Sequence, residues 1–445
     1  MRARLAIVLA ATTAGALSAC GDNVHGGYAA GTRLVPVGYV YEDGTTQPMA
    51  DRFHDLVRDE DCTLQAWADG ERYCTPAATS FVFSDQFCRQ PITKVNPEAP
   101  VGYAEVPFVA PDGTTYVSKL RPLGAPLGDV PYFKAILGDC VGPNVDDTAT
   151  FVEVTPTELG EADFVHVTRA LDEIDDTLSA LRLTTPDGLS LPIGFYDRGD
   201  GIDCAGRDAP DSEATACAPT HGIAASGFFS DAQCTIPSAS ATAVDHDPTL
   251  QAITLDAGGC KRDFALSSDR LFFPSYAVRP DGTCVESDGD GDLLYAAGKP
   301  LEDLPLDRTR VESNTRFSRI VDGWVELDIR DTYVHDNVGG FDCKPVGGLC
   351  QPDSIATTSL FADEQCIVPL ELAYVAPPTC GDPPKFATTI DHRVFAIGDV
   401  YAQPVFTQRF SLGVVCGRAS AILGKEPHVL GNELELGTVT EAALR

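Results

Sequence analysis

The chain has 445 residues, 44% of them hydrophobic, with 65 acidic and 32 basic side chains and a formal net charge of −33. This length allows a large core or several domains. So acidic a surface repels nucleic acid and anionic lipid, and we expect no nucleic-acid partner. With 40 Gly, 32 Pro and 2 Met, the composition favours turns over long helices.

The N-terminus is typical of a secretory signal peptide. Arg2 and Arg4 precede an apolar run from Leu5 to Leu17, followed by small residues. This run has 13 residues, whereas an apolar helix needs about 20 to span a bilayer. We therefore expect residues 1–19 to be removed.

Leu17-Ser18-Ala19-Cys20 resembles the lipobox of bacterial lipoproteins. The resemblance covers residues 1–21 only, and it implies that Cys20 becomes the lipid-modified first residue of the mature chain. Residues 20–31 would then form a flexible tether, and the lipid on Cys20 would provide the membrane contact. The alternative is an ordinary secretory signal followed by an unmodified Cys20.

One nine-residue motif occurs three times, with an aromatic residue, a small residue, Asp, two variable residues, Cys, two variable residues and Pro. Its copies occupy 83–91, 229–237 and 361–369. Their cysteines are 146 and 132 residues apart, which favours a triplicated unit. We expect repeat 1 at 32–178, repeat 2 at 179–314 and repeat 3 at 315–445.

Each repeat begins with an alternating strand that ends in Asp-Gly, the signal of a hairpin. The three copies are Arg33–Tyr41 with Asp43-Gly44, Leu181–Thr185 with Asp187-Gly188, and Phe317–Val321 with Asp322-Gly323. A second strand follows in each repeat.

Two cysteines come next, the first in Asp-Cys and the second in Cys-x-Pro. A hairpin between them would place the two cysteines opposite one another, so we expect a disulfide in each repeat. The expected pairs are Cys62–Cys74, Cys204–Cys217 and Cys343–Cys350. No Cys-x-x-Cys pair occurs, which argues against zinc knuckles and redox motifs of the thioredoxin type.

The motif cysteines Cys88, Cys234 and Cys366 are also expected to form disulfides, and their partners are left open. Either the third cysteine of each repeat pairs with the last, or it pairs with an extra cysteine in repeats 2 and 3. Both schemes leave two cysteines that could link repeats. The residues with unassigned partners are Cys140, Cys260, Cys284, Cys380 and Cys416.

The second half of each repeat contains further short strands, and about eight per repeat at this spacing indicate an all-β sandwich, barrel or propeller. One helix is expected within 164–183, where Leu171, Ile174, Leu178 and Leu181 follow three- and four-residue steps.

Few residues in the sequence suggest chemistry. The motif carboxylates Asp85, Asp231 and Asp363 are expected to be Asx-turns rather than catalysts. We expect the polar stretch 245–247 to be a loop. The run 288–292 resembles the start of an EF-hand loop, but Lys299 stands where the loop needs Glu, so we expect a turn.

The histidines are scattered with no repeated position, at 25, 54, 166, 221, 246, 335, 392 and 428. No catalytic signature for metalloproteases, serine hydrolases or nucleotide binding occurs. We expect no catalytic residues, no metal and no cofactor.

The order of strand, Asp-Gly, Asp-Cys, Cys-x-Pro and the nine-residue motif resembles a module of uncharacterised secreted bacterial lipoproteins. The resemblance covers most of 31–445 and implies no activity. For the architecture we favour an all-β, six-bladed, propeller-like ring with two blades per repeat, because closure removes exposed sheet edges. The alternative is three consecutive small β-domains.

For function we favour a lipid-anchored protein of the bacterial cell envelope, on the outer membrane or the surface rather than the cytoplasmic membrane. It would act as a binding or structural module, with an envelope protein or a glycan as its ligand. The alternative is an envelope hydrolase acting on carbohydrate or peptide through a central channel or a loop. The oligomeric state is left open.

Overall fold

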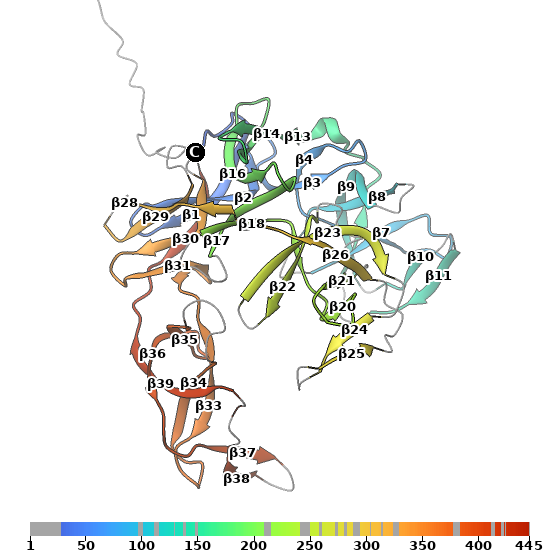
Figure 1. Cartoon of the computed structure of the whole chain (residues 1–445). Coiled ribbons are helices and arrows are strands. Elements are labelled where there is room, and N and C mark those ends of the chain that lie inside the picture. Colours follow the sequence, from blue (N-terminus) through green and yellow to red (C-terminus); the bar gives the residue numbers. More distant parts are fainter. Residues whose placement is uncertain are drawn as a thin grey trace, which may run out of the picture.

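The computed structural model consists of strands apart from one short 3-10 helix, η1 (Glu161–Asp163), within the residues that the structure describes (Figure 1). The all-β class is therefore confirmed. The described residues are 28–444 except 97–100, 111–114, 129, 137–138, 147–149, 209–214, 241–249, 258–259, 272–274, 280–282, 288–293, 303, 313–314, 324–328, 377–382, 411–413, 420–421 and 423.

Three sheets with the same strand order form the centre of the molecule, and we call them ring sheets 1, 2 and 3. Each contains four successive hairpin-connected strands of one repeat, flanked by strands that come from elsewhere in the chain. Ring sheet 1 contains, in spatial order, β13 (Val165–His166), β4 (Arg72–Thr75), β3 (Glu60–Ala66), β2 (Thr46–Asp55), β1 (Leu34–Tyr41) and β40 (Val439–Ala443).

The other two ring sheets repeat this order when read from the opposite edge, and ring sheet 3 has five strands instead of six. Ring sheet 2 contains β14 (Thr168–Glu173), β15 (Leu178–Thr184), β16 (Ser190–Asp197), β17 (Ile202–Asp208), β18 (Thr215–Pro219) and β27 (Leu304–Leu306). Ring sheet 3 contains β28 (Arg308–Glu312), β29 (Phe317–Asp322), β30 (Arg330–Asp336), β31 (Phe341–Val346) and β32 (Leu349–Gln351).

Three crossings of the chain join these sheets into a closed ring. The chain leaves ring sheet 1 through β13 and enters ring sheet 2 through β14. It leaves ring sheet 2 through β27 and enters ring sheet 3 through β28. A bridge between Leu349 and Thr438 then leads into β40, which pairs with β1. The last strand of the chain therefore completes the first sheet.

The hydrophobic cores lie between the ring sheets. Phe53 of ring sheet 1 packs in one cluster with Leu191 of ring sheet 2. Phe195 of ring sheet 2 shares a second cluster with Ile329 of repeat 3. Phe317 of ring sheet 3 shares a third with Tyr41, their ring centroids 4.8 Å apart. Burying such side chains contributes about 1.5–3 kcal/mol each, so the cores stabilise the ring itself.

Each ring sheet carries a small barrel, inserted between its hairpin strands and the next crossing. Barrel 3 is closed, in the order β33 (Ile355–Phe361), β34 (Pro369–Val375), β39 (Glu426–Glu433), β36 (Val394–Val400), β35 (Phe386–Thr388) and back to β33, with the hairpin β37 (Phe406–Phe410) and β38 (Val414–Arg418) attached.

Barrels 1 and 2 have the same strand order, except that the first strand is interrupted. Barrel 1 contains β5 (Ala78–Thr79), β6 (Val82–Phe83), β7 (Pro91–Val95), β8 (Tyr103–Val109), β9 (Thr115–Gly128), β10 (Tyr132–Ile136), β11 (Asp139–Asn144) and β12 (Thr150–Val154). Barrel 2 contains β19 (Gly222–Ala224), β20 (Phe228–Phe229), β21 (Ser238–Ser240), β22 (Ala252–Ala257), β23 (Cys260–Leu271), β24 (Ser275–Val278), β25 (Cys284–Ser287) and β26 (Leu294–Pro300).

The two halves of each repeat form different parts of the molecule, the first a ring sheet and the second a barrel. The first halves close the ring, and the second halves are attached to it. Figure 1 shows barrel 3 extending away from ring sheet 3. The architecture therefore has three tandem repeats and a closed ring, as expected, but the ring closes through three sheets rather than six.

The helix expected within 164–183 is wrong. This segment contains β13, β14 and the start of β15, and β14 forms a hairpin with β15 in which Leu171 lies opposite Leu181. Leu178, Ala180 and Leu181 are all buried. Because β15 is covered on both faces, its apolar residues follow no strict alternation, and the sequence resembles an amphipathic helix.

The described end of the expected tether packs on the ring. Tyr28 is 8% exposed and belongs to the core between ring sheets 1 and 2. Ala29 exchanges backbone hydrogen bonds with Ser190 of β16, at 2.7 and 2.8 Å. The folded body therefore includes residues 28–31, which we expected to belong to the tether.

Candidate functional site

The three expected hairpin disulfides are formed, with Cα–Cα distances of 5.3, 5.2 and 5.3 Å in Cys62–Cys74, Cys204–Cys217 and Cys343–Cys350. Contrary to our expectation, the two cysteines of each bond are not directly opposite one another in the paired strands. Cys74 lies opposite Leu64 rather than Cys62, because Ala66 pairs with Arg72 and so shifts the centre of the hairpin. Each bridge therefore runs diagonally across its pair of strands. We interpret these three bonds as structural.

The motif cysteines pair with the last cysteine of each repeat. The bonds are Cys88–Cys140, Cys234–Cys284 and Cys366–Cys416, with Cα–Cα distances of 5.7, 5.8 and 5.7 Å. Each joins the motif loop to the outer hairpin of its barrel. Of the two pairing schemes, the structure therefore supports the one that leaves Cys260 and Cys380 over.

The motif carboxylates form the expected turns. Asp85 accepts hydrogen bonds from the N–H groups of Phe87, Arg89 and Gln90. Asp363 makes equivalent bonds, and the N–H of Val368 is the main reason why its pKa lies below the usual value. Such carboxylates are occupied by backbone donors, so the motif has a structural role.

Several other expectations fall outside the described residues. These are the signal peptide, Cys20, Cys380 and the stretches 245–247 and 288–292. Within the described residues, no group of three or more His, Cys, Asp or Glu could hold a metal ion. In the same residues, no helix is long and apolar enough to cross a membrane.

The statement that no histidine position repeats is wrong. His54 lies opposite Asp61 in ring sheet 1, and His335 lies opposite Asp342 in ring sheet 3. Each imidazole Nδ1 is bonded to that carboxylate, at 2.8 and 2.6 Å. Repeat 2 has Tyr196 at this position. The two histidines lie in separate sheets, so they do not form a common site.

A turn of one repeat binds to the start of the first ring strand of another, and we call these contacts turn sites. In turn site 1, Asp187 Oδ2 of repeat 2 accepts hydrogen bonds from the N–H groups of Arg33 (2.7 Å) and Leu34 (2.9 Å). In turn site 3, Asp43 Oδ2 of repeat 1 accepts them from Arg316 (3.1 Å) and Phe317 (2.7 Å). Both carboxylates therefore join neighbouring repeats.

The protonation of these carboxylates follows from the same contacts. Burial raises the pKa of Asp187, but the Thr185 hydroxyl and the N–H groups of Leu34 and Arg33 outweigh it, so the pKa lies below its usual value. The pKa of Asp43 is likewise lowered, since hydrogen bonds led by the Phe317 N–H outweigh burial. Both groups are thus held as anions at neutral pH.

Turn site 2, at Thr177 and Leu178, is built differently. Asp175 Oδ1, in the same turn, accepts both N–H groups and the Thr177 hydroxyl, each at 2.8 Å. The corresponding residue in turn site 1 is Gly31, where an added Cβ would lie 2.1 Å from Asp187 Oδ2. In turn site 2 the local Asp175 has therefore taken the place of a neighbouring repeat's carboxylate.

The turn of repeat 3 that corresponds to the Asp43 and Asp187 turns is also placed differently. Asp43 and Asp187 follow the first residue of β1 and β15 by nine positions, whereas Asp322 follows the first residue of β29 by five. Asp322 Oδ1 lies 3.6 Å from Arg308 Nε instead of reaching the N–H groups of turn site 2. Its neighbour Gly323 donates a backbone hydrogen bond to the carbonyl of Asp307.

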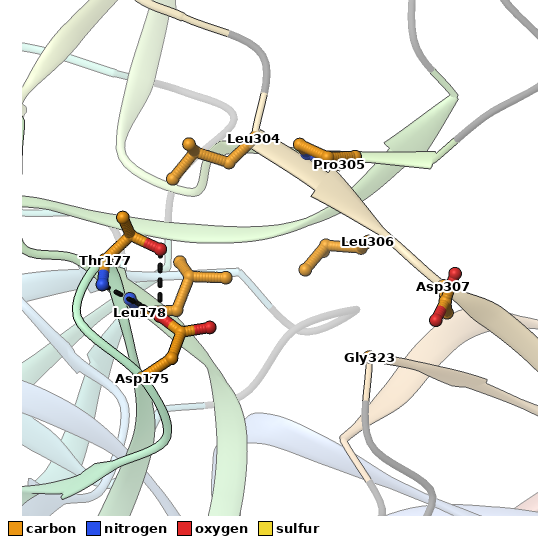
Figure 2. Close-up of a pocket in the computed structure, with 8 residues that line it drawn as sticks. All are labelled: Asp175, Thr177, Leu178, Leu304, Pro305, Leu306, Asp307 and Gly323. Carbon is orange, nitrogen blue, oxygen red and sulfur yellow. Dashed lines mark hydrogen bonds between the residues drawn. The ribbon is translucent and has the colours of Figure 1, made fainter.

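A cavity of about 450 Å³ remains at turn site 2, between ring sheets 2 and 3. Figure 2 shows the turn of Asp175 and Thr177 facing β27, which carries Leu304 and Leu306, and Asp307, which directly follows that strand. The complete lining is Asp175, Thr177, Leu178, Leu304, Pro305, Leu306, Asp307 and Gly323. This cavity, which we call the turn-site pocket, is the candidate functional site.

The pocket has an apolar wall and acidic groups at its opening. Leu178 and Leu306 are buried, whereas Asp175 and Asp307 are exposed. The Leu178 and Thr177 N–H groups hold the pKa of Asp175 below its usual value. Because Asp175 is kept ionised, it is unsuited to act as a general acid. The arrangement can bind a group with an apolar body and a positive charge.

The pocket was not predicted from the sequence. Of the residues in the predicted motifs and elements, only Leu178 and Gly323 line it. One signal was available, because an alignment of the repeats extended to the residues before the first strand places Asp175 against Gly31 and Thr177 against Arg33 and Arg316.

The described structure thus defines the class of the protein. It is an all-β, disulfide-bonded protein whose three repeats close one ring, and a pocket lies at one of the three equivalent contacts between repeats. Residues 14–438 match the family described as "Family of unknown function (DUF7481)", and the chain belongs to that family. No curated protein matches the chain. No solved structure matches it either.

Proposed function

We propose that this protein is a lipid-anchored binding module of the bacterial cell envelope, on the outer membrane or the cell surface. The observation that carries the binding role is the turn-site pocket, because a neighbouring repeat's carboxylate fills two equivalent contacts, whereas the third is bonded by its own Asp175 and leaves a cavity. Pockets that combine apolar walls with a few polar groups are typical ligand sites.

The compartment is supported by the cysteines. Six disulfides are formed within the described residues, and disulfides persist in oxidising compartments outside the cytoplasm. The lipobox-like sequence before Cys20 adds a membrane anchor to this proposal. Seven residues lie between Cys20 and Tyr28, so even a fully extended chain would hold Tyr28 within about 28 Å of the bilayer surface.

The alternative, an envelope hydrolase acting on carbohydrate or peptide, has less support. Hydrolysis by paired carboxyl groups needs one group with a raised pKa, and that of Asp175 is lowered. Binding requires only that the pocket offer complementary shape and charge.

The anchor is tested by metabolic palmitate labelling of the wild type and of Cys20→Ala. We expect the variant to lose the label and to be released from the membrane fraction. A label that persists in Cys20→Ala would remove the anchor from the proposal.

The binding role is tested in cells with a photo-cross-linking amino acid at Pro305, which is exposed at the pocket, and at Val57, which is 73% exposed outside it. We expect a discrete adduct from position 305 only. Equal cross-linking from both positions, or none from position 305, would contradict a pocket ligand.

A further inference from the structure

Four cysteine positions recur in every repeat, and all of them form bonds within their own repeat. Each repeat has one hairpin bond and one bond between the motif cysteine and the last cysteine. These six bonds use twelve of the fifteen cysteines, and the three that remain are Cys20, Cys260 and Cys380. If Cys20 carries the lipid, two cysteines are left for one further bond.

Cys260 and Cys380 differ from the other twelve because neither recurs. Cys260 is the first residue of β23 and follows the β22–β23 turn of barrel 2, whereas barrels 1 and 3 have no cysteine at the corresponding turn. Cys380 precedes β35 of barrel 3, and no cysteine precedes the corresponding strands β8 and β22 so closely. Cysteines that occur once each, at different places in two repeats, are expected of a single bond between those repeats.

The β22–β23 turn of repeat 2 lies near the start of barrel 3. Lys261, which directly follows Cys260, interacts electrostatically with the Asp353 carboxylate. Asp353 is held between β32 and β33, since it pairs with Lys344 Nζ at 2.8 Å and accepts the Tyr333 hydroxyl at 2.5 Å. The main chain at Cys260 is therefore close to repeat 3.

The chain that carries Cys380 returns to the same place. β33 starts two residues after Asp353, and its Ile355 pairs in parallel with Ala387 of β35. β35 starts at Phe386, six residues after Cys380, which itself lies outside the described residues. Because six residues span at most about 22 Å, the chain length permits a bond from Cys380 to the β22–β23 turn.

We propose that Cys260 and Cys380 form a disulfide that joins barrel 2 to barrel 3. The bond forms by thiol–disulfide exchange with a disulfide-bearing oxidant of the compartment, the class of reagent that the other six bonds also need. The two thiols lose two protons and two electrons as the S–S bond forms, and the disulfide of the oxidant accepts them and becomes a dithiol. Repeats 2 and 3 are then linked covalently, whereas each of the other six bonds lies within one repeat.

The bond is tested by peptide mapping of the purified full chain without reduction. Iodoacetamide first blocks any free thiol. Digestion before Asp and after Glu then releases Cys260 in 256–262 and Cys380 in 372–381, each without a second cysteine. We expect mass spectrometry to find these two peptides linked, to find them separate after reduction, and to find no blocked thiol at either position.

Substitutions provide a second measurement. A polyethylene glycol maleimide should shift Cys260→Ala and Cys380→Ala by one step each in a denaturing gel, and should shift neither the wild type nor the double variant, which is the matched control. The wild type should migrate as a monomer without reduction, which excludes a bond between two copies. The double variant should melt several degrees below the wild type, since the bond spans a separation of 120 residues.

Blocked thiols at both positions in the wild type, or a bond from either cysteine to Cys20 or to a second copy, would overturn the proposal. The inference rests on the oxidising compartment of the proposed function and on no part of its pocket. The six bonds within repeats report on that compartment in the same digest. If they are formed while Cys260 and Cys380 are blocked, only this pairing fails, and if they are reduced as well, the compartment fails with it.

Discussion

Removal of the Asp187 carboxylate should weaken the contact between repeats 1 and 2. Asp187→Ala deletes the acceptor of two backbone N–H groups, and one of them belongs to Leu34, which is fully buried. A hydrogen bond to a charged group contributes about 1.5–3 kcal/mol, and Asp187 is partly exposed, so we take the lower end for each. The expected loss is about 2–4 kcal/mol in the free energy of unfolding.

This loss can be measured by urea denaturation followed through tryptophan fluorescence, to which Trp67, 1% exposed in the folded protein, contributes. Asp172→Ala is the control, because it removes a surface ion pair that contributes about 0–1 kcal/mol. If Asp187→Ala and its control differ by less than about 0.5 kcal/mol, the typical range of a neutral surface change, the inter-repeat role of Asp187 is refuted.

The pH dependence of stability provides a second test of Asp187→Ala. The pKa of Asp187 is lower in the folded protein than in the unfolded chain, where Asp titrates near about 3.9. Its contribution is therefore complete above that unfolded-state pKa and is lost as the pH falls through the folded-state pKa. The difference in stability between the wild type and Asp187→Ala should shrink below about pH 4. A difference independent of pH would contradict a contribution from the ionised carboxylate.

Three further changes test other parts of the ring and the barrels. Gly31→Ala should destabilise the protein in thermal melts, since its Cβ would lie 2.1 Å from Asp187 Oδ2, and an unchanged melting temperature would argue against this packing. Replacing Cys88 and Cys140 by Ala together should cost about 4 kcal/mol in urea, from the 52-residue separation that the bond closes; a loss below 1 kcal/mol would show that this bond does not constrain barrel 1. Deleting 439–445 removes β40 from β1 and should reduce the cooperativity of unfolding, so a wild-type transition would contradict ring closure by the last strand.

Local features of the fold could be predicted because local physics determines them. Asp43-Gly44 and Asp187-Gly188 follow alternating strands and form hairpin turns. Asp363 binds backbone N–H groups within five residues of itself, so its motif was sufficient to predict the turn. The hairpin disulfides followed from the short separation of their cysteines.

Long-range features could not be derived in this way. The ring depends on β40 pairing with β1 across the whole chain, and no local pattern indicates which repeat halves close it. The equivalence of His54 and His335 is different, because the sequence already shows it: each histidine stands eight residues before the cysteine of its Asp-Cys pair, and the strand register agrees with this spacing.

The helix error has a related cause. In β15 both faces are buried, so the spacing of apolar residues no longer reports the secondary structure. The pocket could not be predicted for a different reason. It exists because the Asp322 carboxylate does not bind the N–H groups of Thr177 and Leu178. Only the comparison of Thr177 with Arg33 and Arg316 carries a sequence signal for it.

The central claim is that a neighbouring repeat closes two turn sites, whereas the third is closed by its own residue and leaves a pocket. Amide hydrogen exchange of Leu34 and Leu178 tests it most directly in Asp187→Ala and Asp175→Ala. We expect Asp187→Ala to accelerate exchange at Leu34 alone and Asp175→Ala to accelerate it at Leu178 alone. Acceleration at Leu178 in Asp187→Ala, or none at Leu34, would contradict the account.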